Sequence, residues 1–155
     1  MTPYLVAGGI AVVVALCGAL ATDIGPWYRN LRKPTWQPPD WLFGPAWTSI
    51  FTLIAIGAGL AWNRAEPGER LALVVLPFAV NLVLNVAWSF LFFRLRRPRV
   101  AFLEVLALWA SIVWLLASLW QVSPAAGALV VPYLLWVTFA SVLNRTIIRL
   151  NPEVG

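Results

Sequence analysis

Three residues in one apolar stretch, Asn81, Asn85 and Trp88, have the spacing of neighbours on one face of a helix. They occupy positions i, i+4 and i+7, so a helix would present two amides and an indole N–H as a single polar stripe. In apolar surroundings such a stripe is tolerated where it faces other helices or a cavity. The amides could hold helices together or contact a ligand, and both interpretations stay open.

Two further stripes of mostly aromatic residues have helical spacing. One has a small residue between large ones and comprises Tyr133, Trp136, Ala140 and Asn144. The other comprises Phe43, Trp47, Phe51 and Ile54. Each stripe alone is more typical of packing than of a pocket. Together with Trp36 they offer the aromatic walls and the few amide or indole donors that a flat hydrophobic ligand needs.

Acid–base and metal chemistry have little support in the residue types. The chain has no His, which excludes imidazole metal ligation, a Ser-His-Asp triad and a His-ligated haem. The one carboxylate in the later apolar runs, Glu104, lies near Arg97 and Arg99, and we expect an interfacial ion pair there rather than a proton carrier. We therefore expect no metal and no cofactor, and an enzyme of the usual acid–base kind is disfavoured.

The elements that carry these stripes must be membrane-spanning helices. The chain is 61% hydrophobic and only 11% charged, against roughly 25% charged residues in soluble proteins. Apolar runs of about 20 residues are long enough to cross a bilayer as helices. We expect an all-α bundle of five spans forming one domain over residues 1–155, with spans at approximately 4–22, 41–62, 71–93, 100–120 and 127–148.

The first run has a second interpretation, because Ala19-Leu20-Ala21 matches the cleavage pattern of a signal peptide. No Lys or Arg precedes the run, so we expect it to be retained as a span. The connection that follows, residues 23–40, is rich in Pro and Trp. Its prolines exclude an ordinary helix, and we expect it to act as a lid.

The basic residues are distributed unevenly between the two ends of such a bundle. Nine of the 11 Lys and Arg fall on one side: Arg29, Arg32, Lys33, Arg94, Arg96, Arg97, Arg99, Arg145 and Arg149. Only Arg64 and Arg70 fall on the other. The positive-inside rule then predicts an N-out, C-in topology. This topology accounts for the net charge of +5 without a nucleic-acid partner.

Ordered motifs along nearly the whole chain closely resemble the TspO family, which includes the tryptophan-rich sensory proteins of bacteria and the mitochondrial translocator protein or peripheral benzodiazepine receptor. The motifs are Trp27-Tyr28-x-x-Leu31-x-Lys33-Pro34-x-Trp36-x-Pro38-Pro39, Ala46-Trp47-Thr48, Asn81-x-x-x-Asn85-x-x-Trp88-Ser89 and Pro132-Tyr133-Leu134-x-Trp136-x-x-Phe139-Ala140-x-x-Leu143-Asn144. The resemblance implies five packed transmembrane helices, commonly a homodimer, with a pocket under the first connection.

The same resemblance implies ligands and a site. Family ligands include porphyrins such as protoporphyrin IX, sterols, and isoquinoline carboxamide or benzodiazepine-type drugs. By motif the pocket would fall on Trp36, Trp47, Asn81, Asn85, Trp136 and Ala140. With the stripes, the full set of candidate ligand-binding residues adds Trp88 and Tyr133. The sterol motif is incomplete, because Arg145 stands where the family has a Tyr, so sterol affinity is not expected to be strong.

Three functions follow as hypotheses. We favour a binding, sensing or transport protein for porphyrins in a membrane, expected to be the bacterial cell membrane, with the outer membrane left open. The second is porphyrin degradation that needs light and oxygen, for which the resemblance implicates Trp47 and Trp136. The third is a membrane scaffold with an incidental pocket, whose partner would bind the basic face.

Overall fold

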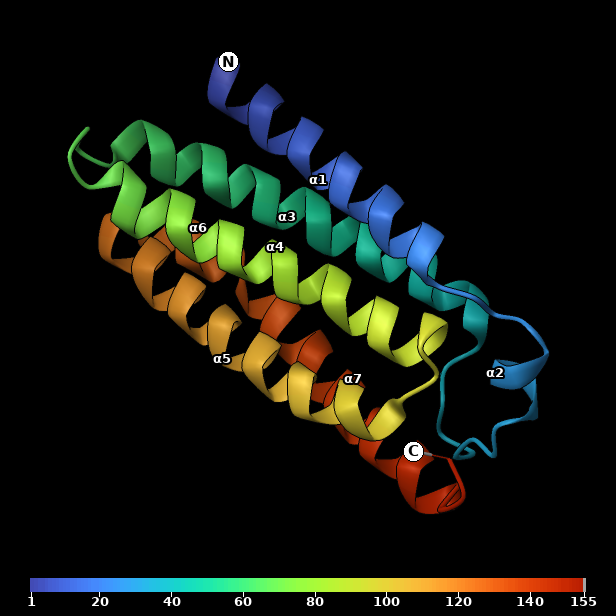
Figure 1. Ribbon diagram of the computed structural model, residues 1–155. Helices are drawn as coiled ribbons and strands as arrows, with labels where there is room; N and C mark the ends of the chain where they lie inside the picture. Colours follow the sequence, from blue (N-terminus) through green and yellow to red (C-terminus); the bar gives the residue numbers. More distant parts are fainter. Residues whose placement is uncertain (155) are drawn as a thin grey trace.

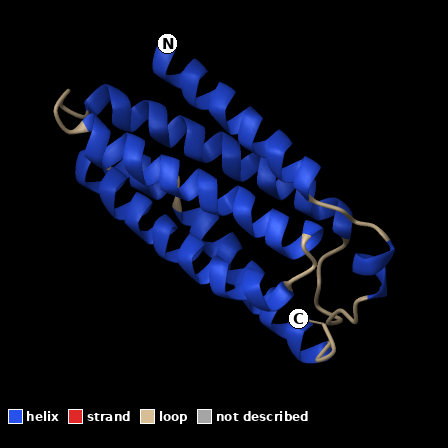
Figure 2. Cartoon of the chain, viewed as in Figure 1, coloured by secondary structure: helices blue, strands red, loops and turns tan. Residues whose placement is uncertain are grey.

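The computed structural model describes residues 1–154, and every regular element in them is helical (Figures 1 and 2). Five of the helical segments are long and apolar enough to cross a membrane. The helices are α1 (Thr2–Ala21), α2 (Pro26–Asn30), α3 (Phe43–Arg64), α4 (Leu76–Ser89), α5 (Pro98–Val122), α6 (Pro124–Ala128) and α7 (Val131–Leu150). The predicted all-α fold with five spans is confirmed.

Proline shapes the third and fifth spans. The third span runs over Leu71–Arg94, because π-helical turns at Leu71–Val75 and Phe90–Arg94 extend α4 at both ends. Pro77 is the second residue after the first of these turns and cannot donate a backbone hydrogen bond. The fifth span, Pro124–Leu150, is interrupted between the end of α6 and the start of α7, and Pro132 is the second residue of α7. The expected continuous helix at 127–148 is therefore two helices joined by a turn.

Helix α5 is the centre of the packing and contacts α4, α6 and α7. Its buried apolar residues follow a helical spacing of three or four and are Ala101, Val105, Leu108, Ile112, Leu115 and Leu119. Helix α1, by contrast, lies at one edge of the bundle against α3 (Figure 1). Where α1 meets α3, the Tyr4 ring occupies the space that a side chain at position 59 would need, so any larger residue than Gly59 would displace this ring.

The first connection folds over one end of the bundle. Its short helix, α2, begins at Pro26, a residue well suited to a first helical position, and a 3₁₀ turn at Asp40–Leu42 leads into α3. Tyr28 and Leu31 are buried against side chains of α5, α7 and the end of the third span. Asn151 joins this connection to the end of α7, because its amide accepts from Arg32 N at 2.9 Å and donates to Arg32 O at 2.9 Å.

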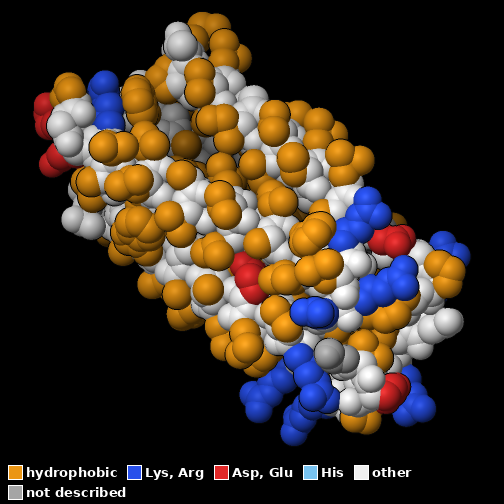
Figure 3. Space-filling view, in the orientation of Figure 1, with side chains coloured by type: hydrophobic (Ala, Val, Ile, Leu, Met, Phe, Trp, Pro, Cys, Tyr) orange, Lys and Arg blue, Asp and Glu red, His pale blue; other side chains and the backbone are white. Residues whose placement is uncertain are grey.

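The basic side chains gather at the end of the bundle that carries this connection and the C-terminus (Figure 3). Because successive spans run in opposite directions, the first and third connections and the C-terminus lie at the same end, and nine of the 11 basic residues lie in or next to these segments. The structure contains no membrane, so the N-out, C-in orientation stays a prediction.

Candidate ligand-binding cavity

A cavity of about 930 Å³ lies beneath the first connection, between α1, α3, α4 and α7. This volume is near the upper end of the range of about 300 to 1,000 Å³ for small-molecule sites. Five of the eight candidate residues line it, namely Trp47, Asn85, Trp88, Trp136 and Ala140. The fold therefore brings residues from three of the predicted spans to one internal surface.

The aromatic wall of the cavity is centred on Trp47. Its ring stacks on Phe51, with centroids 5.5 Å apart, and meets the edges of Tyr133 and Trp136 at 6.0 and 6.5 Å. Trp136 also contacts Phe43 edge to face, at 5.5 Å. Edge-to-face and offset contacts of this kind favour a fixed arrangement of rings. The wall thus presents aromatic faces and edges to the cavity.

The two asparagines of the polar stripe have different surroundings. Asn81 is fully buried away from the cavity and donates to Ser111 Oγ at 3.0 Å, which ties α4 to α5. Asn85 lines the cavity and donates to Tyr133 Oη at 2.9 Å. Tyr133 lies behind the wall and is only 1% exposed. Asn81 thus joins two helices by a hydrogen bond, whereas Asn85 both makes such a bond and lines the cavity.

Trp88 supplies an unused hydrogen-bond donor. Its indole Nε1 is buried and, among residues 1–154, has no hydrogen-bond partner. The residue lines the cavity and packs against Phe92 and Phe93, with ring centroids at 5.4 and 6.0 Å. An unpaired buried N–H is costly, and because protein atoms cover Nε1, a ligand acceptor pairs with it only after the indole shifts.

Trp36 lies outside the cavity. Its side chain is 46% exposed and touches the edge of Phe139 at 5.9 Å. With Asn81 and Tyr133, it is one of three candidate residues that do not line the space. Its stiff, proline-flanked segment lies over the bundle end, so Trp36 contributes to the cover and not to the wall.

Sequence reasoning missed the residues that α1 and the first connection contribute. Helix α1 provides small side chains such as Ala11 and Ala15, which leave the cavity its width. Tyr28 and Asp40 come from the connection, and Asp40 is the only Asp, Glu, Lys or Arg among the lining residues. The stripes contain no carboxylate, but the cavity does. The sequence did offer one indication of this carboxylate, because Asp40 is the last charged residue before the second span.

Tyr28, Gln37 and Asp40 form a hydrogen-bonded cluster at the mouth of the cavity. Tyr28 Oη donates to Asp40 Oδ1 at 3.2 Å and accepts from Gln37 Nε2 at 3.1 Å. Burial, followed by the neighbouring Asp40 carboxylate, raises the pKa of Tyr28 to about 12. The Lys33 ammonium lies 3.7 Å above the centre of the Tyr28 ring. The connection is therefore held by polar contacts of its own.

The expected ion pair at Glu104 is not formed. Among the described residues, neither carboxylate oxygen of Glu104 has a hydrogen-bond partner, although both are buried. Arg99 instead donates to the backbone oxygen of Pro152 at 2.8 Å. The reason is geometric, since Glu104 is the seventh residue of α5, whereas Arg97 precedes the helix and Arg99 is its second residue.

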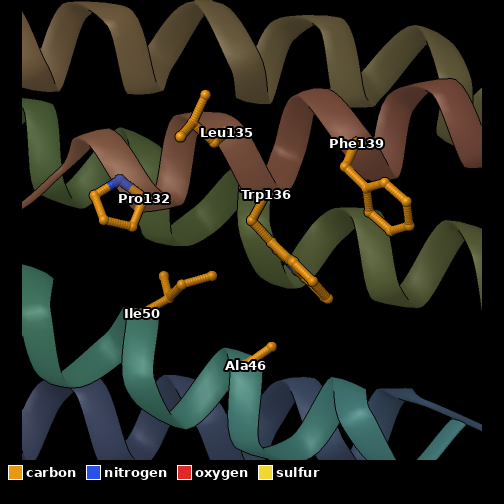
Figure 4. A pocket seen from close by; sticks show the side chains of 6 residues that line it. All are labelled: Ala46, Ile50, Pro132, Leu135, Trp136 and Phe139. Carbon is orange, nitrogen blue, oxygen red and sulfur yellow. The ribbon is translucent and has the colours of Figure 1, made fainter. Parts of the chain in front are cut away.

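A second, shallower hollow of about 400 Å³ lies between α3 and α7 (Figure 4). It is lined by apolar side chains, namely Ala46, Ile50, Pro132, Leu135, Trp136 and Phe139. Figure 4 shows Trp136 projecting from α7 into the space between the two helices. Trp136 lines both hollows, so this indole forms part of the partition between them.

The model of the TspO/MBR family matches residues 5–150. The chain belongs to the TspO/MBR family. It is 39% identical to the tryptophan-rich protein TspO of Chlorobaculum tepidum over 93% of this chain and 92% of that protein. It is 37% identical to the tryptophan-rich sensory protein of Cereibacter sphaeroides over 89% and 88% of the two chains. The translocator protein of Ovis aries is 36% identical over 92% and 88%.

Membership in this family and the five apolar helices together make the chain a multi-pass membrane protein. The family resemblance that the motifs indicated is confirmed. Because the match begins at residue 5, the first apolar run belongs to the matched region.

Proposed function

We propose that this protein binds porphyrins of the protoporphyrin IX type, and similar flat hydrophobic molecules, in the cavity under the first connection. The cavity itself is the observation that carries the proposal. It combines about 930 Å³ of space, aromatic faces at Trp47 and Trp136, and the unpaired N–H of Trp88. Such a site can serve sensing or transport of its ligand in the bacterial cell membrane.

Aromatic faces and a few donors suit a macrocycle with polar substituents. The rings of Trp47 and Trp136 are nearly perpendicular, with an interplanar angle of 83°, so a flat ligand can stack on one and meet the edge of the other. The chain has no His, so binding does not depend on an axial imidazole ligand. Free-base protoporphyrin should then bind at least as tightly as its iron complex.

The test is an absorbance titration of the purified protein with protoporphyrin IX in the dark, followed by illumination of the complex. A saturable shift of the main absorption band that persists in the dark supports binding. A matched titration with the iron complex checks the absence of axial ligation. If the iron complex bound more than about tenfold more tightly than the free base, or by about 1.4 kcal/mol, an axial ligand would have to be present. Absence of any saturable shift would remove the proposed function.

One contact favours a second candidate function, photo-oxidative degradation of the bound porphyrin. The Trp47 and Trp136 rings lie 6.5 Å apart in the wall, where an excited porphyrin would touch an indole. The reaction would require light and molecular oxygen. The parent protein, the double variant Trp47→Phe, Trp136→Phe and an unrelated Trp-rich protein are illuminated at equal porphyrin occupancy. Equal bleaching in all three would exclude the enzymatic reading, and faster bleaching in the parent alone supports it.

We further propose that the protein forms a homodimer and accepts benzodiazepine-type drugs in the same cavity. Sterols are weaker candidates, because Arg145 occupies the position of the Tyr in the family's sterol motif. Competition between such drugs and protoporphyrin, measured with the protein in lipid nanodiscs of defined stoichiometry, tests both the shared site and the dimer.

A further inference from the structure

The end of the cavity nearest the first connection has a charge that a porphyrin pocket would not obviously need. Asp40 is the only Asp, Glu, Lys or Arg side chain among the lining residues, so the cavity presents one negative charge to its occupant. The basic residues of this end of the bundle do not line the cavity. The ammonium of Lys33 lies over the Tyr28 ring, 3.7 Å from its centre, and Lys33 does not line the cavity.

The atoms around Asp40 are short of donors. Asp40 Oδ1 receives hydrogen bonds from Tyr28 Oη at 3.2 Å and from Gln37 Nε2 at 3.4 Å, and both distances are long. Gln37 Oε1 is buried and, within residues 1–154, has no partner. Gln37 does not line the cavity, so the acceptor that an occupant meets there is the exposed carboxylate of Asp40. A carboxylate whose hydrogen bonds are long retains acceptor capacity for a cationic group with N–H donors.

We propose that this end of the cavity is a subsite for an ammonium or amidinium group on a flat hydrophobic ligand, with Asp40 as its counter-ion. The subsite rests on the proposed function, because it uses the same cavity. It makes the protein rank ligands by the charge they carry at this end: cationic derivatives bind most tightly, neutral ones less tightly, and dicarboxylates least tightly. An ionised propionate placed beside Asp40 would meet a like charge.

The experiment uses three porphyrins with one macrocycle: protoporphyrin IX, its dimethyl ester, and the diamide formed with ethylenediamine, which carries two ammonium groups. Each is titrated in nonionic detergent against the parent, Asp40→Asn and Asp23→Asn. Asp23 is an acid of the same connection that does not line the cavity, so its variant controls for net charge. Binding of the neutral dimethyl ester reports whether each variant retains its cavity.

In the parent, the diamide should bind about fivefold or more tightly than the dimethyl ester, as one ion pair at a partly exposed site allows. Asp40→Asn should reduce this preference to within about twofold, while Asp23→Asn retains it. Asp40→Ser serves as a second neutral variant, so the result does not depend on one substitution folding.

A preference for the diamide that survives both neutral variants overturns the subsite. So does tighter binding of the dicarboxylate than of the diamide, which would show that the basic end outside the cavity decides the ranking. Failure of the parent to bind any of the three porphyrins would instead overturn the proposed function, and the subsite with it.

Discussion

Helices α1 and α5 are both long and apolar, but they differ in how they are packed. Helix α5 has nine buried residues along its length and contacts four other helices, α3, α4, α6 and α7. Helix α1 has two, Ala11 and Ala21, and exposes large side chains such as Leu20 over most of its surface. The cavity lies beside α1 and not beside α5. The helix with the most buried residues therefore does not border the cavity.

The physical reason lies in the solvent. In a bilayer an exposed leucine costs nothing, so helices associate through close packing and hydrogen bonds. Helix α5 uses both, since it packs along a continuous stripe and accepts the Asn81 hydrogen bond at Ser111. Helix α1 packs along α3 and against α4, with the close contact of Tyr4 and Gly59, but it buries only Ala11 and Ala21. We infer that α1 and the first connection can adapt to a ligand while α4, α5 and α7 keep their arrangement.

The largest expected effect is on stability. Leu115→Ala, at a fully buried site of α5, should lower the free energy of unfolding by about 2 to 4 kcal/mol, because it leaves a cavity in close packing. Leu20→Ala removes the same atoms from α1, but the Leu20 side chain is 76% exposed. This variant should change the free energy of unfolding by less than about 0.5 kcal/mol. Thermal unfolding in detergent measures both. Equal losses would show that α1 is as tightly packed as α5.

The next effect is on affinity. Trp47→Ala or Asn85→Ala should weaken porphyrin binding by about 1 to 3 kcal/mol, through loss of an aromatic face or of a desolvated hydrogen bond. The matched control is Trp41→Ala, because Trp41 lies near Trp47 in sequence but is 71% exposed and does not line the cavity. Absorbance titration gives the dissociation constants. Unchanged affinity in both cavity variants would place the binding site elsewhere.

A smaller effect should appear in the kinetics of the lid. Asn151→Ala removes two hydrogen bonds to Arg32, each worth about 1 kcal/mol, and loosens the connection from α7. The porphyrin dissociation rate should rise several-fold, and the free energy of unfolding should fall by about 1 to 2 kcal/mol. Asn30→Ala, at an exposed position of the same connection, serves as the control. A dissociation rate equal to that of the parent would mean that the connection does not limit ligand release.

The smallest effect concerns pH. The pKa of Tyr28 is raised to about 12 in the folded protein, against about 10 in an unfolded chain. The neutral phenol therefore stabilises the connection below pH 10, and this contribution is lost as the pH rises from 10 toward 12. The difference in tyrosinate absorbance between the parent and Tyr28→Phe reports the ionisation. Ionisation near pH 10 would show that Tyr28 is not buried under the connection.

Periodicity predicted the cavity wall well where the side chains lie on one helix face. Trp47, Asn85 and Trp136 all line the space that their stripes suggested. The same reasoning could not separate Asn81 from Asn85, because both lie on one face of α4. Only the facing helix distinguishes them, since Ser111 binds the first and Tyr133 the second.

The apolar composition and the spacing of the five runs determined the helical, membrane-spanning fold, because a bilayer permits few alternatives for the backbone. The sequence also determined which face of each helix would be aromatic or polar. The tertiary structure alone decided that Asp40 enters the cavity, that Trp36 stays outside it and that Glu104 has no basic partner. These outcomes depend on how the connection folds over the bundle and on the depth of each residue in its helix, and a one-dimensional pattern contains neither.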